Sequence, residues 1–64
     1  MIILTGINNI EFYLNPDHIE KMESVPETVI TLGNGKKYIV NEGIEEVIDL
    51  IVKYKRRLFS KDFY

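Results

Sequence analysis

Residues 28–40 read TVITLGNGKKYIV, and this stretch decides the fold. Two runs rich in β-forming residues, 28–32 and 36–40, flank a short glycine-containing segment. An Asn-Gly pair between two such runs is the strongest short-range signal for a β-hairpin, because both residues tolerate positive φ. Asn34 and Gly35 therefore predict a structural turn between two antiparallel strands.

The register of this hairpin has two solutions. A two-residue turn at Asn34 and Gly35 pairs Ile30 with Ile39. A three-residue turn with Gly35 in a bulge pairs Val29 with Ile39. We favour the two-residue turn.

Three further strands are expected upstream, separated by turn-forming residues. The run before Gly6 is β-rich, and Ile10–Leu14 alternates in polarity, so the two form a hairpin. Pro16 then breaks the chain. The spacing of apolar residues in the next run is imperfect, which predicts a bulge or a short helical turn at its start. The three strands are Ile2–Thr5, Ile10–Leu14 and Ile19–Val25.

After Val40 the apolar residues change to helical spacing, which predicts a helix over about 42–58. Asn41 is a candidate N-cap, and the acidic residues of the first turns match the positive end of the helix dipole. Basic residues gather at the other end. The periodic apolar residues are Ile44, Val47, Ile48, Ile51, Tyr54 and Leu58.

The predicted fold class is α+β and mainly β. About five short antiparallel strands over 2–40 form a curled meander or half-barrel, and one C-terminal amphipathic helix covers its open face. We expect a single small domain over 1–64, with a frayed tail at 59–64. A chain of 64 residues without cysteine has a thin core and no disulfide, so we also expect association into a homo-oligomer.

The predicted helix is more apolar than one small sheet requires. Its apolar residues span roughly 200° at 100° per residue, whereas a stripe of about 100° suffices for packing on a sheet. Either the curved sheet buries both margins of this arc, or one margin forms an interface with a partner or a second copy. The candidate interface residues are Leu50, Val52, Tyr54, Leu58 and Phe59.

A basic cluster follows in the same segment, although the whole chain has a net charge of −2. It holds five of the eight basic residues of the chain. It either matches the negative end of the helix dipole and aids solubility, or docks on an acidic protein, an anionic membrane surface or RNA. The cluster consists of Lys53, Lys55, Arg56, Arg57 and Lys61.

Residues with the chemistry of catalysis are few. His18 is the only histidine, next to Asp17 in a turn, and there is no cysteine. Glu42, Glu45 and their acidic neighbours fit a solvated helix start better than a convergent acid–base pair. We therefore expect no enzyme activity, no metal site and no cofactor. The opening Met1–Gly6 has no basic or long apolar run, so we expect a cytoplasmic protein without a signal peptide.

The order of several segments resembles a small flagellar protein family, known as FlbD or SwrD. The resemblance rests on the opening Met-Ile-x-Leu-Thr, on Phe12-x-Leu14-Asn15 leading to His18-Ile19-Glu20, on residues 26–32 followed by 34–40, and on a Glu45-Glu46-Val47-Ile48 helix ending in Tyr54-Lys55-Arg56. It implies a non-enzymatic cytoplasmic accessory protein of flagellar motility and swarming. The resemblance also implies that this protein supports motor power by contact with a stator or other motor component at the inner face of the membrane.

The alternative is a small RNA-binding regulator, because the first five residues also resemble the opening of the carbon storage regulator family. That family has basic residues where Gly6, Asn41 and Glu42 stand here. Phosphate contacts need positive charge at the strand edges, so RNA is not the expected partner. Contact with a membrane surface through the basic cluster stays open.

Overall fold

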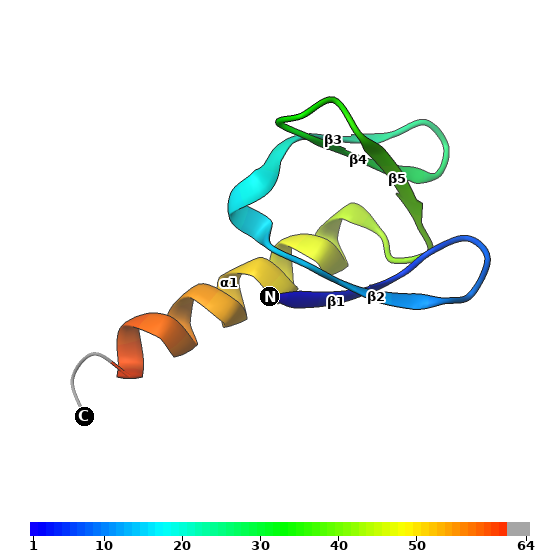
Figure 1. Cartoon of the computed structure of the whole chain (residues 1–64). Coiled ribbons are helices and arrows are strands. Elements are labelled where there is room, and N and C mark those ends of the chain that lie inside the picture. The colour runs from blue at the N-terminus through cyan, green and yellow to red at the C-terminus, as the bar shows by residue number, and fades with distance from the viewer. Residues whose placement is uncertain (62–64) are drawn as a thin grey trace.

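The computed structural model describes residues 1–61, with side chains up to Phe59. It contains five antiparallel strands followed by one helix, so the predicted α+β, mainly β class is confirmed. Figure 1 labels these elements. Their bounds are β1 (Ile2–Thr5), β2 (Glu11–Leu14), the 3₁₀ turn η1 (Pro16–His18), β3 (Ile19–Ser24), β4 (Thr28–Leu32), β5 (Lys37–Val40) and α1 (Ile44–Lys61).

The strands form two sheets, β1-β2 and β3-β4-β5, which meet at a single bridge between Gly6 and Val40. Beside this bridge, the N–H of Ile7 donates to the carbonyl of Ile39 at 3.2 Å, and the N–H of Asn41 donates to the carbonyl of Thr5 at 2.8 Å. β1 and β5 are therefore joined only at their ends. The strands curl in the order β2-β1-β5-β4-β3, and η1 links the two outer strands.

The hairpin between β4 and β5 has the three-residue turn, so the favoured two-residue turn is wrong. Val29 pairs with Ile39, and the N–H of Leu32 donates to the carbonyl of Lys36 at 2.8 Å. Gly35 has a φ of 89°, which glycine adopts at no steric cost. This register places Val40 on the same face as the buried β4 residues, whereas a shift by one residue turns Val40 to the outside.

The start of β3 has both features that the imperfect alternation predicts. The side chain of Asn15 accepts the N–H of Asp17 at 3.0 Å and so caps η1, in which Pro16 supplies the fixed φ of the first position. A bulge follows between Ile19 and Lys21. These two irregularities turn the chain from β2 into β3.

The core lies between the two sheets and the first turns of α1. Val47 is the helix residue that is fully covered, with an exposed fraction of 0%. Phe12, Tyr38, Leu50 and Tyr54 pack around the core and are partly exposed. The buried apolar side chains are Ile2, Leu4, Leu14, Ile30, Leu32, Val40 and Val47.

The helix begins and ends later than predicted, at Ile44–Lys61 in place of about 42–58. Asn41 is not its N-cap, because the Asn41 backbone N–H bonds to β1 and its side chain donates to Asn9 at 2.9 Å. The first helical hydrogen bond runs instead from the N–H of Val47 to the carbonyl of Gly43 at 3.0 Å. The helix extends through Lys61, into the segment expected to fray, and 62–64 lie outside the described residues.

Candidate functional site

The second half of α1 extends beyond both sheets. The whole of α1 has 18 residues and is about 27 Å long at a rise of 1.5 Å per residue. The exposed fraction increases from 0% at Val47 to 47% at Leu58 and 65% at Phe59. Figure 1 shows the first turns of α1 against the sheets and its orange part running past them. The helix thus supplies the core at one end and an accessible surface at the other.

The two margins of the apolar arc have different surroundings. Leu50 and Tyr54 are half-buried and pack against the core. On the opposite margin, Ile48 and Val52 remain 41% and 40% exposed, in line with Phe59. The five candidate interface residues therefore do not form one surface. Leu50 and Tyr54 pack on the sheets, whereas Val52 and Phe59 lie on the open margin.

Leu58 lies between these margins, near the end of the helix. With Tyr54, Arg57 and Met1 it lines a small hollow beside the start of β1. Met1 is 61% exposed, so the apolar surface continues from the helix onto the N-terminus.

Most of the basic cluster faces solvent. Lys53, Arg56 and Arg57 are exposed. Lys55 differs, because its Nζ lies 3.0 Å from Oδ1 of Asp17 and donates a hydrogen bond to it. This ion pair joins the helix to η1. Because its two side chains are 50% and 61% exposed, it contributes little to stability. The side chain of Lys61 lies outside the described residues.

Charge is segregated along α1. Glu45, Glu46 and Asp49 occupy its first two turns, and the basic side chains occupy the turns that project from the sheets. This order matches the helix dipole at both ends. Although the whole chain has a net negative charge, this order places positive potential on the projecting end of α1, which is the part most accessible to a partner.

Glu42 connects the start of the helix to β1. Its two carboxylate oxygens accept the backbone N–H of Thr5 at 2.8 and 3.1 Å. Burial acts to raise the pKa of Glu42, but the hydrogen bonds from Thr5 and from its own backbone outweigh burial and lower the pKa below 4.5. This carboxylate accepts a backbone N–H at the edge of β1 that is not paired with β2, and it makes that edge negative. An RNA-binding protein needs positive charge at such an edge.

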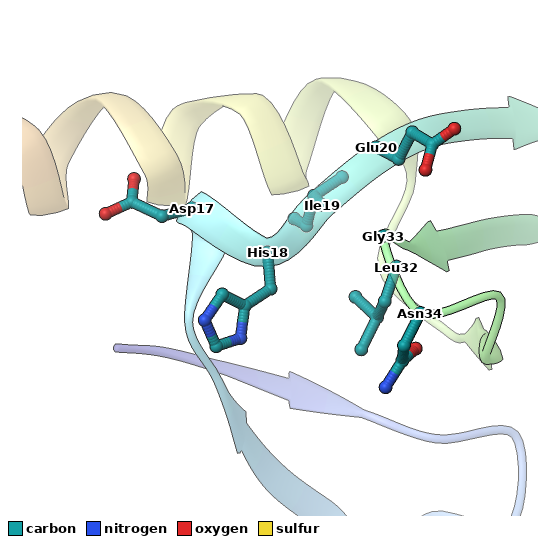
Figure 2. Close-up of a pocket in the computed structure, with 7 residues that line it drawn as sticks. All are labelled: Asp17, His18, Ile19, Glu20, Leu32, Gly33 and Asn34. Atoms are coloured by element: carbon teal, nitrogen blue, oxygen red, sulfur yellow. The ribbon is translucent and has the colours of Figure 1, made fainter.

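A hollow lies where η1 and β3 approach the end of β4. In Figure 2 the side chains of His18, Leu32 and Asn34 point toward the same side of this hollow, whereas that of Asp17 points away from it. Asp17 therefore binds Lys55 and does not orient the imidazole of His18. The carbonyl of His18 accepts the N–H of Gly33 at 3.0 Å, which is a structural role. This arrangement lacks the base-and-orienter geometry that nucleophilic catalysis uses.

Sequence reasoning missed an apolar patch at the end of the β1-β2 hairpin. Ile7 and Ile10 are 57% and 64% exposed there, beside Ile39 of β5. The rings of Phe12 and Tyr38 stack underneath with centroids 5.1 Å apart. The signal available in the sequence was the pair of isoleucines flanking the polar turn at 8–9, where exposed apolar residues are unusual.

Two further observations concern metal ions and membranes. Within residues 1–61, no three histidine, cysteine, aspartate or glutamate side chains are grouped so that they could hold a metal ion. In the same part of the chain, no helix combines the length and apolarity needed to cross a bilayer.

The family model described as "FlbD: Flagellar and Swarming motility proteins" matches residues 1–59, which is nearly the whole chain. The chain has no significant match to a curated protein or to a solved structure.

Proposed function

This chain belongs to the FlbD family of flagellar and swarming motility proteins, and from this membership we propose that it is a non-enzymatic accessory protein of the flagellar motor. It works in the cytoplasm, at the inner face of the membrane. There it supports motor power by contact with an acidic surface of a stator or other motor component.

The observation that carries this proposal is the exposed basic end of α1. Lys53 and Arg57 are exposed, and both lie in the second half of α1. The chain as a whole has a net charge of −2, so this positive surface is local. Local charge steers association and selects partners of opposite sign. An acidic protein surface therefore fits the end of α1.

The experiment replaces Lys53 and Arg57 together with glutamate, in a strain that lacks the chromosomal gene. The matched control is Lys36→Glu/Lys37→Glu, which makes the same change of charge at exposed positions of the β4-β5 hairpin. We expect the helix variant to lose swarming and motor torque while filaments still assemble. The hairpin variant should behave as wild type.

Three outcomes contradict parts of the proposal. Normal torque and swarming in the deletion strain contradict a role in motor power. Full complementation by Lys53→Glu/Arg57→Glu contradicts docking through the basic end. Salt-sensitive binding to phosphatidylglycerol vesicles that this variant loses, without any binding to motor proteins, makes the membrane surface the partner.

A further inference from the structure

The open margin of α1 has the spacing of a helix-pairing seam. Ile48, Val52 and Phe59 are separated by four and seven residues and fall within about 40° of one another around the helix. Their exposed fractions are 41%, 40% and 65%. Lys55 completes the repeat between Val52 and Phe59. Apolar residues at this spacing pack into the matching row of a second helix.

The charges beside this seam change sign along the helix. Asp49 and Arg56 are seven residues apart and fall within about 20° of one another on one side of the seam. Glu45 instead lies in the seam row itself, seven residues before Val52. The carboxylate of Asp49 lies toward the N-terminal end and the guanidinium of Arg56 toward the C-terminal end. A second helix running in the opposite direction places its own Arg56 opposite Asp49. The row is therefore complementary to itself under a two-fold axis, which is the symmetry of an isologous dimer.

We propose that a second copy of this chain packs on the open margin of α1, with the two helices antiparallel. The axis passes between Val52 and Lys55, so Ile48 of one copy meets Phe59 of the other. Asp49 and Arg56 form two symmetric pairs along the side of the seam. Antiparallel helices at the shallow crossing angle of such packing lie about 8–10 Å apart.

Lys55 is compatible with its place in the seam because of Asp17. The ion pair at 3.0 Å directs the ammonium group toward η1 of its own chain. Its aliphatic stem can therefore cover Val52 of the second copy while the charge stays in water. A lysine at such a position restricts the register of the two helices and weakens the pairing.

The available area makes this dimer a weak one. The exposed parts of Ile48, Val52 and Phe59, at 41%, 40% and 65%, amount to roughly 300 Å² for each copy, which is within the range of the largest apolar patch on a typical monomer. Two copies then bury roughly 600 Å² of apolar surface, and the contact approaches the lower limit of specific interfaces, about 1,200 Å², only when the flanking side chains are included. We expect dissociation in the micromolar range.

The seam is distinct from the surface of the proposed function. Lys53 and Arg57 lie roughly 120–160° around the helix from the seam, so a dimer leaves them exposed. Self-association neither requires nor excludes docking on a motor component. The complementation experiment tests docking and the measurement of mass tests self-association, so either proposal can fail without the other.

The test is sedimentation equilibrium of the whole chain from low to high micromolar concentration. Wild type should change from monomer to dimer across this range. Arg56→Glu places like charges opposite each other and should weaken the dimer about tenfold or more. The double variant Asp49→Arg/Arg56→Glu exchanges both signs in both copies and should restore most of the affinity. Arg57→Glu makes the same charge change away from the seam and should leave the affinity unchanged.

Cooperative thermal unfolding of each variant shows that it is folded before its mass is compared. A wild type that stays monomeric at every concentration overturns the proposal. A double variant no tighter than Arg56→Glu alone overturns the antiparallel pairing, because only a self-complementary seam is rescued by exchanging its own charges. An equal loss in Arg57→Glu also overturns it, since general charge repulsion then explains the effect.

Discussion

The hydrogen bonds between Glu42 and Thr5 offer a direct test of how the helix is held to β1. Both carboxylate oxygens accept one backbone N–H, at 2.8 and 3.1 Å, across 37 positions of the chain. Glu42→Gln keeps the size of the side chain and one acceptor oxygen but removes the charge. We expect this substitution to lower the free energy of unfolding while the fold persists.

The magnitude follows from the charge of the acceptor. A hydrogen bond to a charged group contributes about 1.5–3 kcal/mol, and a neutral one about 0.5–1.5 kcal/mol. Glu42 is half-buried, so water screens part of the difference. We expect a loss of about 1 kcal/mol, which lowers the Tm of a domain this small by roughly 4–8 °C.

The effect must depend on pH in one direction. The folded-state pKa of Glu42 lies below 4.5, because the hydrogen bonds from Thr5 and its own backbone outweigh the effect of burial. A carboxylate with a lowered folded pKa stabilises the fold fully above its unfolded pKa, and the contribution is lost as pH falls through the folded pKa. The difference in Tm between wild type and Glu42→Gln should therefore disappear in acid.

Thermal unfolding followed by circular dichroism measures both effects. The control is Glu20→Gln, the same chemical change at an exposed position of β3, away from the helix dipole. At neutral pH only Glu42→Gln should lower the Tm by several degrees. An equal Tm for both variants refutes the structural role of the carboxylate, and a Glu42→Gln deficit that persists in strong acid refutes its ionised state as the cause.

Two further substitutions test the core and the turn. Val47→Ala removes two methyl groups from a site that is 0% exposed, so it should cost about 2–3 kcal/mol in urea unfolding, whereas Val25→Ala, at 68% exposure, should cost little. Gly35→Ala should cost about 1 kcal/mol in the same assay, because Gly35 has a φ of 89°. The space around an added Cβ is open, so this cost comes from the backbone conformation and not from a steric clash. Gly33→Ala should change the free energy of unfolding by no more than about 0.5 kcal/mol. Equal losses for Val47→Ala and Val25→Ala, or for the two glycine variants, contradict the respective assignment.

Local chemistry made most of the fold predictable from the sequence. The turn at Asn34 and Gly35, the break at Pro16 and the helical spacing after Val40 each depend on neighbouring residues alone. The register of the hairpin does not depend on neighbouring residues alone. It depends on which face of β5 meets the core, and Val40 decides this only once β1 and α1 are in place. The helix start was missed for a similar reason, since Asn41 bonds to β1 and Asn9.

The candidate surface was predictable in composition but not in geometry. The sequence shows an apolar arc and a basic cluster on one helix, but which margin is covered depends on where the sheets lie. Leu50 and Tyr54 pack on the core, whereas Val52 and Phe59 do not. The ion pair of Lys55 with Asp17 is equally hidden in the sequence, because the two residues are 38 positions apart.

The two proposals together explain why one short helix carries two kinds of charge pattern. An antiparallel dimer places the basic ends of its two copies at opposite ends of the paired helices, and Lys53 and Arg57 of each copy face outward. Such a dimer presents two identical basic surfaces to its surroundings. If a partner offers two acidic sites, the second contact occurs at a high effective concentration, so weak docking at each surface would be enough to hold the dimer in place. A weak seam and an exposed basic end are thus consistent with each other, because neither contact has to be strong alone.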